Sequence, residues 1–340
     1  MYKKPLILAI ESSCDDTAAA VINGRKVLSN CVANQKIHIA YGGVVPELAS
    51  RAHQSKIIPV VQQALQQANI NKKELTAIAY TQGPGLLGSL LVGNAFAKSL
   101  ALALNIPLVP INHLQGHLLV HFIEDERIQI PSFPFLGVIL SGGHTQLVDV
   151  RDHFNMNILG TTLDDAIGEA FDKCGKRMGL PYPSGPLIDE IAKKGNPHKF
   201  IFPISKLSNY NVSYSGVKTA FINFISNNEQ KDPDFIKYNL VDLCASLQYT
   251  LVQIILTKIK LVARDKNLTE IVIGGGVAAN TEIRKQLQDI VIKEDWTLSL
   301  PPLEYTTDNA AMIGITAYYK ILKKEYGSLK DFSNARLKFN

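Results

Sequence analysis

Two stretches of the sequence, 128 residues apart, repeat one strand–turn–strand pattern. Residues 7–22 and 135–150 align without a gap, with short polar turns at 12–16 and 141–144. The aligned identities include Leu8 with Leu136, Ser13 with Ser141, and Thr17 with Thr145. Apolar runs rich in strand formers flank each turn, which predicts two β-hairpins. Paired hairpins with polar turns can present N–H groups and hydroxyls to phosphate, although two unrelated hairpins would share this pattern.

A glycine-rich turn lies in the second half of the chain. Residues 269–280 are typical of a buried strand, a turn of three consecutive glycines and a helix start. Glycine lets backbone approach a ligand closely, and a helix N-terminus favours negative charge. The turn lacks the Walker and Rossmann spacings, and a tight strand-to-helix connection needs glycine without any ligand. With the two hairpins it resembles the adenosine-side loop of the actin–hexokinase–Hsp70 (ASKHA) superfamily, in which nucleotide lies between two related lobes.

The rest of the pattern is mixed α/β and predicts two domains. A chain of 340 residues with 46% hydrophobic residues can build two cores. Charged residues and Pro131 place the boundary near 123–132, giving lobes at 1–130 and 131–340. Residues 196–216 are rich in turn formers and indicate an inserted subregion. Helices are expected at 50–69, 86–104, 189–194, 240–266, 281–293 and 308–324, and further strands at 77–81, 108–111 and 298–300.

Net charge, cysteine spacing and apolar segments bear on the cellular location and the partners of the protein. The net charge of +5 permits an acidic partner such as nucleic acid without identifying one. The four cysteines lie at no metal or redox spacing, so reduced thiols are expected. The first residues show no signal-peptide pattern, and the apolar segment 86–104 contains Asn94 and Lys98. We therefore expect a soluble cytoplasmic protein with a core helix at 86–104 and no membrane span.

His113 and His117 are the pair whose spacing alone suggests chemistry. Residues four apart lie on one helix face, and Asn112 is a favourable N-cap, so both imidazoles can share one divalent metal. Two ordinary structural histidines would show the same spacing. A zinc protease of the HExxH type needs a glutamate after the first histidine, and that position is Leu114. A metalloprotease would therefore lack its base.

The chain resembles the TsaD/Gcp family in a series of blocks that run in order over nearly its whole length. The histidine pair lies within the family signature, together with Lys98, Ser99, Asn105, Pro107 and Gly116. Further matching blocks lie at 11–17, 41–53, 83–88, 141–146, 164–173, 182–186, 214–218, 274–280 and 307–313. The family was formerly described as O-sialoglycoprotein endopeptidases and is now described as tRNA N6-adenosine threonylcarbamoyltransferases. The single-chain length is similar to the bacterial or organellar form.

The resemblance implies an acyltransferase. A synthase makes threonylcarbamoyl-AMP from threonine, bicarbonate and ATP. The TsaD protein transfers the threonylcarbamoyl group to N6 of adenosine 37 in tRNAs that read codons starting with A, and AMP leaves. The family works with a paralogous TsaB subunit and a small TsaE ATPase, for which helices 50–69 and 86–104 are the expected contact faces.

The resemblance also implies the site residues. His113, His117 and Asp308 match the metal ligands, for Fe²⁺ or Zn²⁺. The matching substrate positions are Ile139, Leu140, Ser141, Gly142, Gly143, Asp172, Gly185, Asp189 and Asn280. Glu11 is expected near the carbamoyl carbon, and Glu11 or Asp15 is the candidate general base, because the adenosine amino group is a poor nucleophile.

Structural roles are open for several of these residues. Asp308 could stabilise a helix N-terminus, Asn280 could be an N-cap, Asp172 a surface acid, and Gly185 a turn residue. Three rival functions are also open: an ATP-dependent small-molecule kinase of the same superfamily, a metalloprotease, and a non-catalytic paralogue. The paralogue would be expected to lose the histidine pair, which this chain keeps.

Overall fold

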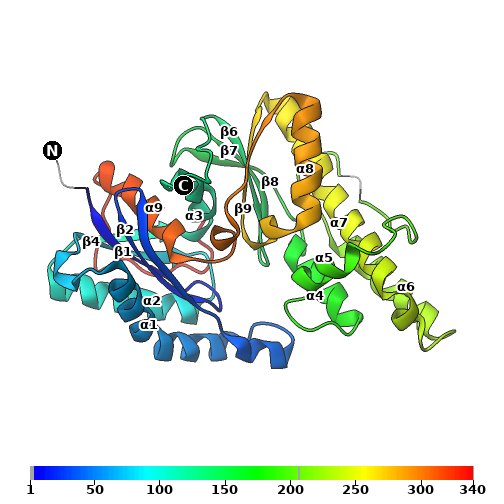
Figure 1. Cartoon of the computed structure of the whole chain (residues 1–340), viewed down its shortest axis with the longest axis horizontal. Helices are drawn as coiled ribbons and strands as arrows, with labels where there is room; N and C mark the ends of the chain where they lie inside the picture. The colour runs from blue at the N-terminus through cyan, green and yellow to red at the C-terminus, as the bar shows by residue number, and fades with distance from the viewer. Residues whose placement is uncertain (1–3, 206, 340) are drawn as a thin grey trace. The chain divides into compact units, whose positions relative to one another are not determined.

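The computed structural model describes residues 4–205 and 207–339. These form two compact units, drawn together in Figure 1. Unit 1 comprises Met1–Pro131, His153–Asn155 and Pro301–Asn340, and unit 2 comprises Ser132–Asp152 and Met156–Leu300. The sequence-based boundary assigned all of 131–340 to the second lobe, whereas residues 301–340 belong to unit 1. The reason is that α9 (Ala310–Leu322) packs on β1 and β2 of the first sheet.

Unit 1 is built on a five-stranded sheet of order β3-β2-β1-β4-β5. Its strands are β1 (Leu6–Glu11), β2 (Thr17–Asn23), β3 (Lys26–Ala33), β4 (Ala77–Gly83) and β5 (Leu108–Asn112). Its helices are α1 (Pro46–Ala68), α2 (Leu87–Leu104), α3 (His113–Leu119) and α9, with 3₁₀ turns at Lys36–Tyr41, Lys72–Glu74, Val120–Phe122 and Leu303–Tyr305. The hairpin β1–β2 is antiparallel, and β4 and β5 continue parallel to β1.

Both faces of this sheet are buried, which explains why β1 is apolar at nearly every position. Leu8 and Ile10 point into the core beneath α1 and α2, together with Ile57 and Ala97. Ala9, on the opposite face, meets α9, where a Cβ added at Gly314 would lie 3.3 Å from the Ala9 Cβ. The sheet thus lies between α1 and α2 on one side and α9 on the other.

Unit 2 has a five-stranded sheet of order β10-β9-β6-β7-β8. Its strands are β6 (Phe135–Leu140), β7 (Thr145–Val150), β8 (Met156–Thr161), β9 (Glu270–Gly274) and β10 (Thr297–Ser299). Its helices are α4 (Ile167–Arg177), α5 (Gly185–Ala192), α6 (Ser215–Glu229), α7 (Phe235–Lys266) and α8 (Thr281–Glu294), with a 3₁₀ turn at Gly276–Ala279. Leu136, Val138 and Leu140 of β6 face a core that includes α7.

The two sheets have the same strand order and the same strand directions. In each, a hairpin pairs antiparallel with a third strand, and two later strands extend the sheet in parallel. The residues aligned in the repeat fall in equivalent strands, β1 with β6 and β2 with β7. Phosphate binding by the two turns stays a prediction.

The predicted helices and strands are all present, with bounds that shift by a few residues. Helix α5 begins four residues earlier than expected, and α9 begins at Ala310 because Asn309 is its N-cap. Strands β3 and β8 and helices α4 and α6 were not predicted. The described residues of this region, 196–205 and 207–214, are irregular apart from an isolated bridge at Val212, and α6 begins at Ser215.

Two helices, α2 and α7, are long and apolar enough to cross a membrane by composition. The most apolar window of α7 is two-thirds buried inside the protein, as in a core helix. That of α2 is only one-third buried, and Leu87, Leu91 and Leu102 are about half exposed or more. An exposed apolar face of this kind marks a contact with another protein or with a membrane, and two such helices are weak evidence for a membrane span.

Candidate functional site

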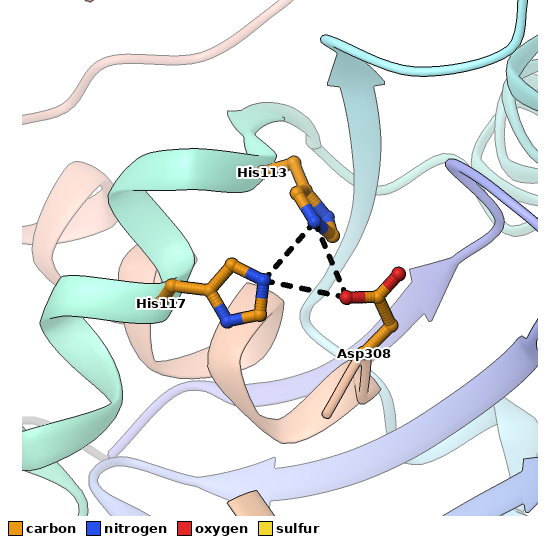
Figure 2. A group of neighbouring side chains, drawn as sticks. All are labelled: His113, His117 and Asp308. Atoms are coloured by element: carbon orange, nitrogen blue, oxygen red, sulfur yellow. Dashed lines mark hydrogen bonds and ion pairs between the residues drawn. The ribbon is translucent and has the colours of Figure 1, made fainter. Parts of the chain in front are cut away.

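The histidine pair stands at the start of α3, which follows β5 without a loop. Asn112 ends the strand and caps the helix, because its Oδ1 accepts the N–H groups of Leu114 (2.9 Å) and Gln115 (3.3 Å). His113 is therefore the first helical residue and His117 lies one turn later. Both side chains are buried, and their Nε2 atoms lie 3.2 Å apart (Figure 2).

Asp308 completes the group from the segment before α9. Its Oδ1 lies 3.4 Å from the His113 Nε2 and 3.3 Å from the His117 Nε2. Helix capping, the alternative role for Asp308, falls to its neighbour Asn309, whose side chain accepts the Met312 N–H at 3.0 Å. The Asp308 carboxylate is thus available to face the two imidazoles (Figure 2).

The geometry of these three side chains fits a metal ion. Two nitrogens and one oxygen lie within 4.8 Å of one another. Ligands bonded at about 2.0–2.1 Å with tetrahedral angles lie about 3.3–3.4 Å apart, close to the separations seen here. Imidazole and carboxylate ligands suit Fe²⁺ and Zn²⁺, and three protein ligands leave a position open for substrate. The residues present therefore fit the metal that the sequence predicts.

The electrostatics of the group also favour a cation. Burial opposes the charged form of His113, but Glu11 and Asp308 outweigh it and hold the pKa of His113 well above its ordinary value. Burial lowers the pKa of His117. For Asp308, burial raises the pKa, but His113 and His117 outweigh it and hold the carboxyl far below its usual range. The buried carboxylate of Glu11 and the partly exposed carboxylate of Asp308 beside one imidazolium thus leave excess negative charge, which a divalent ion would balance.

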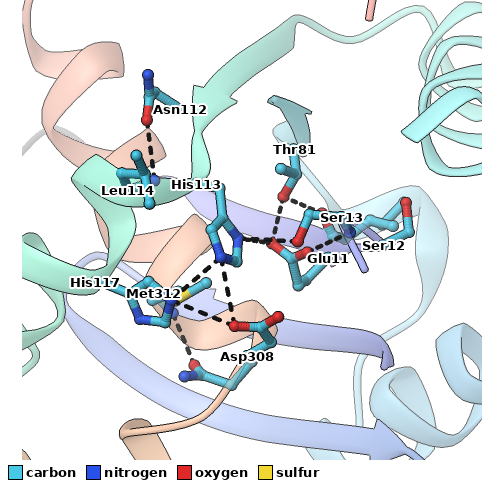
Figure 3. Close-up of polar contacts among 12 residues, drawn as sticks. Glu11, Ser12, Ser13, Thr81, Asn112, His113, Leu114, His117, Asp308 and Met312 are labelled. Carbon is cyan, nitrogen blue, oxygen red and sulfur yellow. Dashed lines mark hydrogen bonds and ion pairs between the residues drawn. The ribbon is translucent and has the colours of Figure 1, made fainter. Parts of the chain in front are cut away.

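Glu11, at the end of β1, is fully buried behind His113, and hydrogen bonds occupy both of its oxygens (Figure 3). Its Oε1 accepts the Ser13 N–H at 2.5 Å, and its Oε2 accepts the Thr81 hydroxyl at 2.6 Å. The His113 Nδ1 lies 2.9 Å from Oε2 and 3.1 Å from the Ser13 Oγ. A carboxylate that accepts a hydrogen bond from Nδ1–H keeps the proton on Nδ1 and leaves the Nε2 lone pair for a metal.

Glu11 was predicted from the sequence to lie near the reacting carbon as a candidate base. The structure gives it a different set of contacts, because it orients His113 from the side away from Asp308. Sequence reasoning missed Thr81 and the contact of Ser13 with His113. The one available signal was Ser13 itself, which occupies a repeated position.

Asp16, in the same turn as Ser13, yields a test of the local electrostatics. Burial, followed by the charge of Asp15, raises the pKa of Asp16 from 3.8 to about 7. As pH rises, Asp16 loses its proton at a lower pH in the unfolded chain than in the folded protein. Between the unfolded pKa of 3.8 and the folded pKa of about 7, Asp16 therefore lowers the free energy of unfolding progressively. Metal-free Asp16→Asn protein should be about 2 kcal/mol more stable than wild type at pH 8, with allowance for partial exposure, and no more stable at pH 4.

Urea unfolding at both pH values measures this difference. Asparagine keeps the Oδ1 that accepts the Asn34 Nδ2 at 2.9 Å, so loss of that hydrogen bond does not confuse the result. An equal stability difference at pH 4 and pH 8 would exclude the titration of Asp16 as its cause.

The predicted substrate turn lies in unit 2. Ile139 and Leu140 are buried at the end of β6, and Ser141 begins the turn that leads to β7. The Ser141 Oγ accepts the His144 N–H at 3.0 Å, which fixes the turn. Gly142 and Gly143 are exposed, and a Cβ added at either would meet no atom within 4 Å. Their backbone is therefore open to a ligand.

The glycine-rich turn lies against the same strand end. Gly275 has a φ of +93°, and a Cβ there would lie 2.4 Å from the Leu140 carbonyl oxygen. Only glycine permits this backbone conformation and this close approach together. The 274–276 turn and the 141–143 turn are thus neighbours within unit 2.

The four remaining candidates form two groups in unit 2. The Asp172 Oδ1 accepts the N–H groups of Ser184 (2.7 Å) and Gly185 (3.3 Å) at the start of α5. Asp172 is half-buried, which raises its pKa, and the two hydrogen bonds give it a structural role at the start of α5. Asp189 accepts both the N–H (3.0 Å) and the hydroxyl (2.9 Å) of Thr281.

Asn280 and Gly185 also have structural roles. The Asn280 Oδ1 caps α8 by accepting the Ile283 N–H at 3.0 Å, and its Nδ2 donates to Gln248 at 2.9 Å. Asn280 is thus the N-cap that the alternative interpretation described. A Cβ at Gly185 would meet only the Phe171 Cβ, at 3.8 Å, so space does not require glycine there.

Comparison with known proteins gives the family. The sequence matches the family described as "TsaD: tRNA N6-adenosine threonylcarbamoyltransferase" over residues 26–315. A relative from Christiangramia forsetii, named tRNA N6-adenosine threonylcarbamoyltransferase, is 56% identical over 333 residues, covering 98% of each chain. A relative of the same name from Riemerella anatipestifer is 52% identical over 338 residues, covering 99% of each.

Among solved structures, full-length HypF in a phosphate- and nucleotide-bound form has a similar fold, with a TM-score of 0.61 at 11% identity. The match covers 97% of this chain and 48% of HypF, so it supports the α/β architecture alone. The family rests on the curated relatives, which share half or more of their residues with this chain over nearly its full length. The chain belongs to the TsaD family of tRNA N6-adenosine threonylcarbamoyltransferases.

Proposed function

We propose that this chain transfers the threonylcarbamoyl group from threonylcarbamoyl-AMP to N6 of adenosine 37 in tRNAs that read codons starting with A. In this reaction the N6–carbon bond forms, the bond from the carbamoyl carbon to the AMP phosphate oxygen breaks, and N6 loses a proton as AMP leaves. The carrying observation is the convergence of His113, His117 and Asp308 in a chain 56% identical to a protein of this name.

His113, His117 and Asp308 would hold the metal, Fe²⁺ or Zn²⁺. When bound, such an ion supplies Lewis acidity that polarises a carbonyl oxygen of the threonylcarbamoyl group. The protein would hold these ligands in position. Asn112 sets the start of α3, and Glu11 turns the His113 Nε2 toward Asp308. Since Glu11 is fully buried and already accepts hydrogen bonds from Ser13, Thr81 and His113, the partly exposed Asp15 in the same turn is the better candidate for the general base.

The polar groups of unit 2 are proposed to bind the AMP portion. The open backbone at Gly142 and Gly143 offers N–H groups to the phosphate, which is the leaving group. Asp172, Asp189, Gly185 and Asn280 are assigned to the nucleoside. Each carboxylate oxygen can accept two hydrogen bonds, so Asp189 can bind a ribose hydroxyl while it also holds Thr281.

Asp172→Asn protein should bind AMP about tenfold or more weakly, because a hydrogen bond to a charged group contributes about 1.5–3 kcal/mol. The asparagine keeps the Oδ1 that accepts the Ser184 and Gly185 N–H groups, so α5 should start as before. Isothermal titration with AMP measures the change. Unchanged AMP affinity would remove Asp172 from the nucleoside site.

The exposed apolar face of α2 is the proposed contact surface for a TsaB-like paralogous subunit. Leu87, Leu91 and Leu102 lie on α2, and Ile58 is exposed on the neighbouring α1. A TsaE-like ATPase and the synthase of threonylcarbamoyl-AMP are the other partners that this function requires. We propose a cytoplasmic location, where these partners and tRNA would be available.

Neither rival enzyme gains support from the site. Leu114, where a protease would carry its glutamate, is buried. A small-molecule kinase would need no His–His–Asp group.

The test is to incubate the protein with its partner subunits, threonylcarbamoyl-AMP and a tRNA transcript, and then to digest the tRNA and analyse its nucleosides. Modified adenosine should form with adenosine at position 37 and not with guanosine there, because guanosine has no N6 amino group. ATP-dependent phosphorylation of a small molecule, with no tRNA modification, would favour the kinase.

A further inference from the structure

Residues 327–339, which follow α9, cross the ends of β4 and β5 as an irregular segment that we call the strap. Backbone hydrogen bonds hold it in place along its length. The Gly327 N–H donates to the Leu108 carbonyl (2.8 Å), and the Asn334 N–H to that of Gln82 (2.9 Å). The Gly85 N–H donates to the Ala335 carbonyl at 3.3 Å. The strap therefore extends the hydrogen bonding of the sheet at these two strand ends.

Polar side chains of α2 and β4 donate hydrogen bonds to the strap. The Asn94 Nδ2 donates to the Ser333 Oγ (2.9 Å), and the Lys98 Nζ donates to the Asp331 carbonyl. The Gln82 Nε2 donates to the Phe332 carbonyl at 3.1 Å. Asn94 and Lys98 are the amide and the charged residue that interrupt the apolar helix α2, and the strap accounts for both.

The far end of the strap reaches the start of α3, the helix that carries His113 and His117. The Lys338 carbonyl accepts a hydrogen bond from the Asn112 Nδ2 at 3.0 Å. The Oδ1 of the same amide caps α3. One side chain thus joins the strap to the first turn of the helix that begins at His113.

We propose that the strap is a positioning element for the metal centre. An asparagine amide can turn over, and a fixed acceptor at Lys338 determines that Oδ1 faces the helix N–H groups. The strap also bridges β4, which carries Thr81 beneath Glu11, and β5, which leads into His113. It therefore holds both supports of the His113 ring, the helix start and the Glu11 contact. Residues that orient metal ligands in this way affect metal affinity without touching the ion.

The close approach of the strap to β4 offers a way to displace the strap by a substitution outside it. A Cβ at Gly83 would lie 1.9 Å from the Asn334 carbonyl oxygen, which is much closer than two non-bonded atoms can approach. Gly83→Ala should therefore push the strap away without replacing any of the proposed metal ligands, Glu11 or Asn112.

Three variants test the inference by cobalt binding to metal-free protein, measured by visible absorbance. Asn112→Ser keeps an N-cap oxygen but is too short to reach Lys338. Gly83→Ala displaces the strap, and a chain that stops after Asn334 lacks its far end. Each should bind cobalt about tenfold more weakly than wild type, the lower range for a residue that orients a ligand. Lys338→Ala, which keeps the carbonyl, should bind as wild type does.

A thermodynamic cycle separates positioning from general destabilisation. If the strap acts through Asn112, the shortened chain with Asn112→Ser should bind cobalt no more weakly than either single variant. Lower melting temperatures of the metal-free proteins with unchanged cobalt affinity would overturn the inference, as would fully additive losses. The inference about the strap rests on the metal site of the proposed function. Wild-type protein without cobalt affinity would contradict that site and this inference with it, whereas losses of affinity without tRNA modification would count against the transferase alone.

Discussion

His117→Ala protein is expected to lose its bound metal and to transfer the threonylcarbamoyl group at least about 100-fold more slowly than wild type, since the lost charge stabilisation is several kcal/mol. His117 is one of the three proposed ligands, and its Nε2 lies 3.2 Å from that of His113 and 3.3 Å from the Asp308 Oδ1. A ligand set of one imidazole and one carboxylate is too small for a catalytic site of this type. Elemental analysis and single-turnover transfer measure the two effects on the same preparation.

His198→Ala is the matched control for this experiment. His198 is exposed in unit 2, where its ring contacts Tyr249, so it reports any adventitious metal held by surface histidines. The control should keep wild-type metal content and rate. AMP binding should be the same in all three proteins, because the groups assigned to AMP lie in unit 2. Full transfer activity in metal-free His117→Ala protein would show that the histidine pair has only a structural role.

Glu11→Gln protein should bind metal about 10–100-fold more weakly, the usual effect of losing the partner that orients a ligand. Glu11 accepts from Ser13 N–H, the Thr81 hydroxyl and His113. Glutamine has one acceptor oxygen and a donor amide, so at least one of these donors would face another donor in a buried site. The His113 ring would then lose the fixed Nδ1 partner that directs Nε2 to the metal.

The same variant separates this role from that of a general base. Loss of a base would slow the chemical step and leave metal affinity unchanged. Loss of an orienting group lowers metal affinity, and high metal concentration should then recover much of the rate. Thr81→Val supports the comparison, because it removes one donor to Glu11 and should lower metal affinity in the same direction by a smaller factor. Glu11→Gln protein with wild-type metal affinity and a slow, metal-insensitive rate would favour the base.

Local pattern was sufficient to predict most of the helices, most of the strands and the position of the two histidines at the start of a helix. Residues four apart on a helix must lie together, and Asn112 had the chemistry of a cap, so the start of α3 followed from the sequence. The third ligand did not follow from spacing. Asp308 lies 191 residues beyond His117 and was identified through the family resemblance, and its own neighbour Asn309 turned out to be the cap.

Long-range packing explains what the sequence did not reveal. Glu11 meets His113 only because β1 and β5 flank β4, and its burial depends on that strand order. The return of residues 301–340 to unit 1 depends on the contact of α9 with the face of β1 that carries Ala9. The strap has no periodic pattern, since its contacts are backbone hydrogen bonds to distant strands. No local rule could predict either contact.

The central claim is that the metal group of unit 1 serves transfer of threonylcarbamoyl to tRNA. Its most direct test is a single-turnover reaction of threonylcarbamoyl-AMP with tRNA and the partner subunits, comparing wild type with His113→Ala protein. Wild type should form one modified adenosine for each AMP released, and His113→Ala should form almost none while it still binds AMP. Equal rates in the two proteins, or AMP release by wild type without modified nucleoside, would contradict the claim.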